Sequence, residues 1–149
     1  MANGEWGVAN LPHGAANSPF AIRRSTFRLM LVHVLKSKIH RATVTGASLN
    51  YEGSLTIAAD LMEQAGFFPY ERILCGNLGN GNRWETYVIE GPRGSGTIEL
   101  NGAVAHLGKL GDKVTIMSFT EVDAIQARGW EPTVILLGEK NAVVDARGK

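Results

Sequence analysis

Short runs of alternating apolar and polar residues follow one another from residue 29 onward, and this two-residue period predicts β-strands. The first run, 29–35, is almost entirely apolar, which predicts a strand buried on both faces. The run 39–45 is rich in β-branched residues, which favour strands. Further strands are predicted over residues 54–57, 73–77, 83–89, 97–100 and 113–119, and a last, long strand over 133–137.

Helical periodicity is weaker and is confined to short segments. A helix is predicted over residues 60–65, with Leu61 and Met62 toward the core and Gly66 as its C-terminal stop. Two further helical segments are predicted over residues 102–107 and 121–128.

The predicted strands are short and are separated by turns at regular intervals, which is typical of a closed β-barrel or a β-sandwich. The pair Asn80-Gly81 predicts a tight hairpin between two of them. Residues 1–28 are rich in Gly, Ala, Asn and Pro and have no apolar period, so a disordered arm is predicted there. Residues 29–149 are predicted to form a single folded domain.

Composition narrows the classes of function. Hydrophobic residues make up 44% of the chain and charged residues 19%, which is typical of a compact domain. The formal net charge is only +1, so the chain lacks the excess of positive charge that binding to nucleic acid requires. The single cysteine, Cys75, excludes an internal disulfide and, with only four histidines, a cysteine-rich metal site. We expect a buried thiol, no metal and a reducing cytoplasm.

Neither export nor membrane insertion is expected. The pair Arg23-Arg24 superficially resembles part of a twin-arginine signal. The apolar stretch 29–35 that follows is short, contains His33 and lacks a small-residue cleavage site.

The pair Gly53-Ser54 offers the most specific chemistry. A glycine carbonyl carbon is unshielded, and the following serine hydroxyl can attack it if the turn is strained and the oxyanion finds donors. β-Elimination from the resulting ester converts the serine to dehydroalanine, which loses ammonia in water to leave an N-terminal pyruvoyl group. Such a ketone forms a Schiff base with an amine and acts as an electron sink. Gly-Ser pairs are common and the great majority are ordinary turns, so the pair alone does not decide the function.

Several motifs accompany this pair. They are KSKIHRATVT at 36–45, YEGS at 51–54, NGNRWETYVI at 80–89, GSG at 94–96, NGAVA at 101–105 and GD at 111–112. In these segments and their order, the chain resembles the aspartate 1-decarboxylase family, pyruvoyl-dependent enzymes that make β-alanine for pantothenate. The resemblance implies a six-stranded double-psi β-barrel and a homotetramer with sites between neighbouring subunits. Met30 lies where chains of this family usually begin, so the preceding residues are either an added arm or a misplaced start.

The resemblance also implies roles for single residues. Ser54 is the precursor of the pyruvoyl group, so neither a metal nor pyridoxal phosphate is expected. Thr86 assists cleavage after Gly53 by offering its hydroxyl to the oxyanion. Tyr87 donates a proton during turnover, since a phenol ordinarily keeps its proton at neutral pH. Without the resemblance, Thr86 and Tyr87 fit as ordinary strand residues. Whether maturation needs a helper protein is left open.

Cationic and small residues complete the implied site. Lys38 and Arg83 hold the two carboxylates of aspartate, and Arg offers a bidentate fork for one of them. The pocket is lined by Thr86, Gly102, Ala103 and Val104, with His40, Tyr51 and Asn101 in support. His40 is about equally compatible with a structural role in its strand.

Two positions depart from the family pattern. Ala58 replaces an acidic residue, which removes a helix N-cap typically worth about 1 kcal/mol unless Asp60 takes over. Val104 replaces an alanine, and extra methyl groups in a pocket change substrate choice by about 1–3 kcal/mol.

The function expected is the conversion of L-aspartate to β-alanine and CO2 by a self-cleaving, pyruvoyl-dependent decarboxylase. One alternative is the same mechanism acting on a related amino acid in secondary metabolism, motivated by Val104 and the N-terminal extension. Another is an uncleaved, non-enzymatic barrel that serves as a binding or assembly module. A DNA-binding barrel is a distant third, because the net charge is close to zero.

Overall fold

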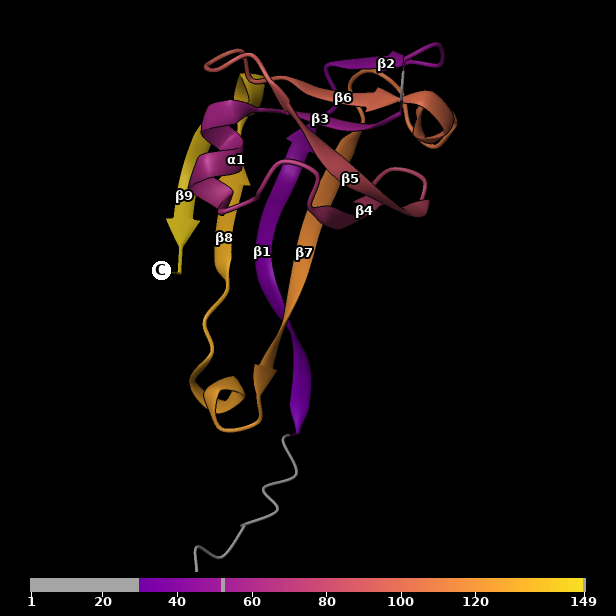
Figure 1. Ribbon diagram of the computed structural model, residues 1–149. Coiled ribbons are helices and arrows are strands. Elements are labelled where there is room, and N and C mark those ends of the chain that lie inside the picture. The colour runs from indigo at the N-terminus through magenta and orange to yellow at the C-terminus, as the bar shows by residue number, and fades with distance from the viewer. Residues whose placement is uncertain (1–29, 52, 149) are drawn as a thin grey trace, which may run out of the picture.

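A computed structural model describes residues 30–51 and 53–148 of the chain (Figure 1). The arm predicted over residues 1–28 lies outside the described residues, so the domain division stays a prediction. The described chain is mainly β, with one α-helix and three 3-10 turns, as the alternating pattern indicates.

Nine strands of the described chain follow the hydrogen-bonded order β2-β6-β3-β5-β4-β7-β1-β8-β9. They are β1 (Leu31–Thr43), β2 (Gly46–Ser48), β3 (Ser54–Ala58), β4 (Arg72–Asn77), β5 (Arg83–Gly91), β6 (Ile98–Asn101), β7 (Lys113–Asp123), β8 (Thr133–Leu137) and β9 (Val143–Arg147). The pairs β1–β8, β2–β6 and β3–β5 are parallel, and the other five pairs are antiparallel. Parallel neighbours need crossover connections, so segments far apart in the sequence lie side by side.

Strand β1 unites the two strands that the sequence predicts at 29–35 and 39–45. Its register against β7 shifts after Leu35 and again after Ile39, and such bulges let one long strand bend while interrupting its alternation. The predicted burial of 29–35 on both faces is wrong, since Leu31 is 49% exposed. The first half of β1 and the end of β7 extend below most of the other strands (Figure 1), and Leu31 and Phe119 in these segments are exposed.

Two predictions near the C-terminus are also wrong. Strand β7 continues through Asp123, where the sequence predicts a helix over 121–128. The Asp123 carboxylate accepts hydrogen bonds of 2.8 Å from the backbone N–H groups of Ile125 and Gln126, which starts a turn. Only the 3-10 turn η2 (Gln126–Gly129) follows, and β8 is not the last strand because β9 pairs with it.

Helix α1 (Ala59–Ala65) is confirmed, and Gly66 ends it in the left-handed conformation with φ of +69°. Asp60 does not take over the helix cap. The N-cap residue is Ala58, which makes no side-chain cap, and the Asp60 carboxylate accepts a 2.7 Å hydrogen bond from the N–H of Gly94. None of the helices in the described part of the chain has the length and apolar character needed to cross a bilayer.

The core is one cluster of branched side chains contributed by most of the strands. Its largest members, each no more than 1% exposed, include Ile39, Leu55, Ile57, Ile73, Ile98, Leu100, Ile116 and Ile135. Burying one such side chain contributes about 1.5–3 kcal/mol. Strand β3 lies at the centre of this cluster, because all five of its residues are buried between β5 and β6.

The position of Cys75 in β4 gives a first prediction. Its side chain is fully buried, as the sequence indicates, and burial raises the pKa of the Cys75 thiol to about 12. Because the thiolate is the reactive form, the native protein should resist alkylation by iodoacetamide at pH 8, and unfolding in guanidinium should expose one reactive thiol per chain. Intact mass measures both, and rapid labelling of the native protein would contradict the burial.

Candidate active site

The Gly53-Ser54 pair leads into β3 through an unusual backbone conformation. Both residues have positive φ, +97° at Gly53 and +81° at Ser54. Glycine adopts such angles freely, whereas in a serine they cost about 1–3 kcal/mol. The backbone at the predicted cleavage bond is therefore strained.

The hydroxyl of Ser54 is buried and makes no hydrogen bond within the described residues. The residue is 4% exposed, and its Oγ has no hydrogen-bond partner within residues 30–51 and 53–148. Buried hydroxyls are nearly always paired, and leaving one unpaired costs about 1–3 kcal/mol. An uncommitted hydroxyl directly after a glycine carbonyl fits the precursor of a pyruvoyl group.

The segment after β6 closes over this turn. Asn101 lies opposite Ser54 in the antiparallel β3–β6 pair, and its amide donates a buried 2.8 Å hydrogen bond to the Thr56 hydroxyl. The next residue, Gly102, has φ of +63° and starts the 3-10 turn η1 (Gly102–His106). A β-carbon on Gly102 would lie 2.9 Å from the Gly53 Cα and 3.3 Å from its nitrogen. The predicted pocket segment thus packs directly against the strained turn.

Thr86 and Tyr87 lie on β5, which runs parallel to β3 with Leu55 opposite Val88. Tyr87 and Thr86 directly precede Val88 in the chain, just as Ser54 and Gly53 directly precede Leu55. Thr86 is half-buried and Tyr87 is 39% exposed, so an incoming molecule can reach the phenol.

The cationic residues lie elsewhere in the single chain. Arg83, at the start of β5, lines a cavity of about 340 Å³ together with Thr115 and Met117. Lys38 lines a different cavity of about 380 Å³ beside Glu131. Ser54 is not among the lining residues of either cavity, so one described chain does not gather the whole predicted site.

The remaining predicted residues divide between the two regions. His40 makes a 3.2 Å hydrogen bond through Nδ1 to the hydroxyl of Thr115, beside the Arg83 cavity. Burial, aided by the positive charges of Lys38 and Arg41, lowers the pKa of His40, which favours the neutral ring. Near Ser54, Tyr51 and Ala103 are exposed, whereas Val104 packs in the core.

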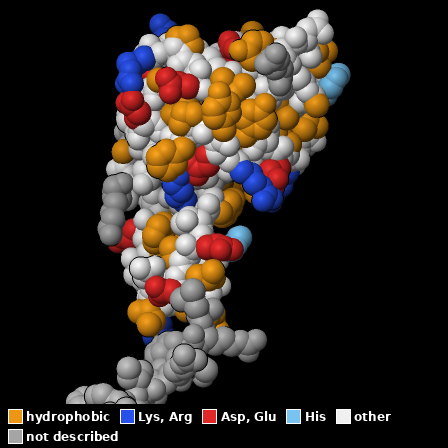
Figure 2. Space-filling view, in the orientation of Figure 1, with side chains coloured by type: hydrophobic (Ala, Val, Ile, Leu, Met, Phe, Trp, Pro, Cys, Tyr) orange, Lys and Arg blue, Asp and Glu red, His pale blue; other side chains and the backbone are white. Residues whose placement is uncertain are grey.

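One aromatic neighbour has no counterpart in the sequence prediction. The ring of Tyr70 lies 6.3 Å from that of Tyr87, centroid to centroid, with 38° between the ring planes. Figure 2 shows hydrophobic side chains gathered on the upper part of the molecule, and exposed aromatics of the described chain include Phe68, Tyr70 and Tyr87. A lone loop aromatic carries no periodic signal, so sequence reasoning missed Tyr70.

Comparison with known proteins decides the family. A family profile described as aspartate decarboxylase matches residues 30–144. The chain belongs to this family. The mainly β fold expected from the resemblance is confirmed, and the fold of the family is a double-psi β-barrel.

Relatives that are named for a decarboxylase activity align with most of the chain. A protein of Chloroherpeton thalassium named aspartate 1-decarboxylase is 52% identical over 112 residues, 75% of this chain and 82% of the relative. One of the same name from Pelotomaculum thermopropionicum is 52% identical over 118 residues, 79% of this chain and 89% of its own. A third, from Maricaulis maris, is 45% identical over 115 residues and is covered to 95%.

The contact between Gly102 and Gly53 gives a second prediction. In a Ser54→Ala background, which keeps the chain intact, Gly102→Ala should lower the free energy of unfolding more than Gly94→Ala does. Both glycines have positive φ, which costs alanine about 1–2 kcal/mol, but only the new β-carbon at 102 meets backbone atoms within 4 Å. Guanidinium unfolding measures the difference. An equal loss of unfolding free energy in the two variants would contradict the prediction, because it would show that the Gly53 turn accommodates the β-carbon at residue 102 without energetic cost.

Proposed function

We propose that this protein cleaves itself between Gly53 and Ser54, and that the mature chain converts L-aspartate to β-alanine and CO2. The observation that carries the proposal is the buried, uncommitted Ser54 hydroxyl at a strained bond, in a chain of the aspartate decarboxylase family. The names of the relatives support the substrate.

In the cleavage step, Ser54 Oγ adds to the carbonyl carbon of Gly53 and its proton passes to the Ser54 nitrogen. The C–N bond breaks, which converts the amide to an ester with a free amine. Loss of the Ser54 Cα proton then expels Gly53 as a carboxylate, and water replaces the nitrogen of the dehydroalanine as ammonia. In this proposal Thr86, on the strand β5 that pairs with β3, supplies a hydroxyl donor for the oxyanion.

In turnover, the pyruvoyl ketone at residue 54 supplies the electron sink for loss of CO2. In this proposal Tyr87 is the proton donor, because its phenol is exposed and it directly precedes Val88, the residue opposite Leu55 of β3. Gly102 and Ala103 line the approach to residue 54. Val104 packs in the core, which does not favour the alternative in which its methyl groups select another amino acid.

Lys38 and Arg83 bind the carboxylates of aspartate in this proposal. Their separation from Ser54 within one chain supports a site completed by a neighbouring copy in a homotetramer. The proposed compartment is the cytoplasm, where a helper protein can act on maturation.

Scission itself is the third prediction. Denaturing mass spectrometry should find fragments 1–53 and 54–149, the second blocked to Edman degradation by its terminal ketone. Ser54→Ala removes the nucleophile and should remain a single inactive chain. Aspartate turnover by protein that stays intact would overturn both the cleavage and the pyruvoyl cofactor, whereas an intact parental chain without activity would favour the uncleaved, non-enzymatic alternative.

The fourth prediction separates maturation from turnover. Thr86→Ala should slow scission because the oxyanion loses a donor. Tyr87→Phe should cleave at the parental rate yet lose about 10²-fold or more in kcat, the usual contribution of a general acid. The measurements are fragment yield over time and CO2 release per pyruvoyl group. If Tyr87→Phe releases CO2 at the parental rate, another group is the donor.

A further inference from the structure

Tyr70 holds a backbone conformation that its residue type disfavours. Its φ is +64°, in the left-handed region, although it is a bulky residue in an exposed loop. Such an outlier costs about 1–3 kcal/mol and persists only where surrounding contacts impose it. Core packing does not require this tyrosine, because the residue is 76% exposed.

The backbone of the loop is tied to the strand that carries Tyr87. The N–H of Tyr70 donates to the carbonyl of Val88 at 2.8 Å, and the N–H of Val88 donates to the carbonyl of Glu71 at 3.0 Å. The Glu71 N–H in turn donates to the carbonyl of Phe68 at 3.1 Å. These bonds fix residue 70 beside the residue that follows Tyr87.

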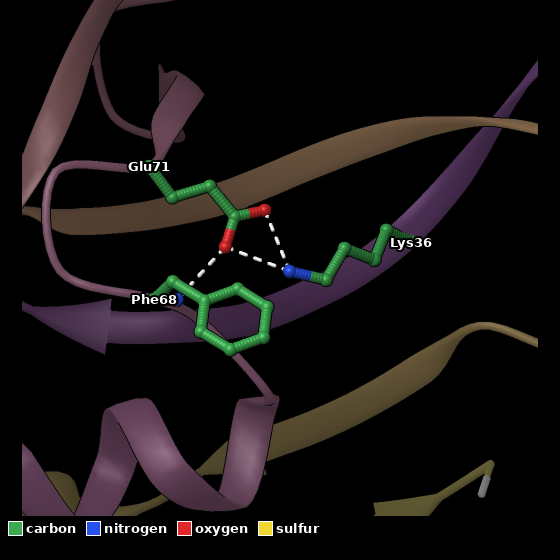
Figure 3. Close-up of polar contacts among 3 residues, drawn as sticks. All are labelled: Lys36, Phe68 and Glu71. Carbon is green, nitrogen blue, oxygen red and sulfur yellow. Dashed lines mark hydrogen bonds and ion pairs between the residues drawn. The ribbon is translucent and has the colours of Figure 1, made fainter.

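A half-buried ion pair fixes the same loop to β1 (Figure 3). The Lys36 ammonium lies 2.8 and 2.7 Å from the two carboxylate oxygens of Glu71, and the Phe68 N–H donates to one of these oxygens at 2.8 Å. The Lys36 Nζ also lies 4.4 Å from the centroid of the Phe68 ring. The Lys36 and Glu71 side chains are only 22% and 16% exposed, which limits screening by water.

The backbone hydrogen bonds to Val88 and the Lys36–Glu71 ion pair together fix the position of the Tyr70 ring. The Tyr70 centroid lies 6.3 Å from that of Tyr87, within the 4.5–7 Å range that aromatic pairs prefer. We propose that Tyr70 is a positioning residue for the decarboxylation, because its ring restricts the rotation of the Tyr87 side chain. This inference rests on the proposed role of Tyr87 as proton donor.

A matched pair of variants isolates the ring from the loop. Tyr70→Phe keeps the ring, whereas Tyr70→Gly removes it and relieves the positive φ. Tyr70→Gly should cleave normally and keep the parental melting temperature, because relief of strain offsets the lost ring contact. Its kcat per pyruvoyl should fall about ten- to a hundredfold with little change in KM, the scale expected when a catalytic group is misplaced by about 1 Å. Tyr70→Phe should match the parental enzyme in every respect.

A double-mutant cycle tests whether Tyr70 acts through Tyr87. In a Tyr87→Phe background, Tyr70→Gly should cause no further loss of kcat, since the proton donor is already gone. Parental kcat in folded, cleaved Tyr70→Gly, or an equal loss in both backgrounds, would overturn the inference. Should the glycine variant fail to fold, Tyr70→Asn repeats the test, because asparagine tolerates positive φ.

The outcomes also separate this inference from the proposed function. If Tyr87→Phe is inactive while Tyr70→Gly keeps the parental kcat, only the role of Tyr70 fails. If Tyr87→Phe itself turns over aspartate at the parental rate, both the donor assignment and the role of Tyr70 fail.

Discussion

The candidate site depends on how strand β3 is held. β3 pairs in parallel with β5 on one side and antiparallel with β6 on the other, and all five of its residues are buried. A slip of one residue would reverse the faces presented by Leu55 and Ile57, which the core does not permit. The strain at Ser54 therefore cannot relax by movement along the strand, and it stays at the bond where the strand begins.

The same two pairings bring distant segments to that strand. β6 places Asn101 opposite Ser54, and Gly102, which follows it, packs against Gly53. On the other side, β5 pairs with β3 from Val88 onward, directly after Thr86 and Tyr87. None of these residues is near Ser54 in the sequence, so mixed parallel and antiparallel pairing around one buried strand is what brings their segments together.

Periodicity predicted most of the strands, because the core face of each alternates with a more polar one. It failed where geometry interrupts the pattern, as at the bulges of β1, and where a strand is as short as β2. It also mistook 121–128 for a helix, because the turn there depends on the Asp123 carboxylate rather than on any period. These features are set by single hydrogen bonds and register shifts.

The sequence motifs predicted which residues belong to the candidate site, but they could not predict the backbone conformations and contacts of those residues. The positive φ of Ser54, the isolation of its hydroxyl and the close approach of Gly102 arise only when β3, β5 and β6 assemble. Tyr70 was missed for the same reason, since its significance comes from a neighbouring strand. That Lys38 and Arg83 line two different cavities, neither of which Ser54 lines, is likewise a property of the folded chain.

The strand order has a consequence for a chain cut after Gly53. The shorter piece would keep β1 and β2, and the longer one β3 through β9. Because β1 lies between β7 and β8 and β2 pairs with β6, the shorter piece is interwoven with the longer one rather than attached at its edge. Unfolding the cut protein would then also be a dissociation, and its recovery would depend on concentration. The covalent link that lowers the entropic cost of assembly would be present for the first folding only.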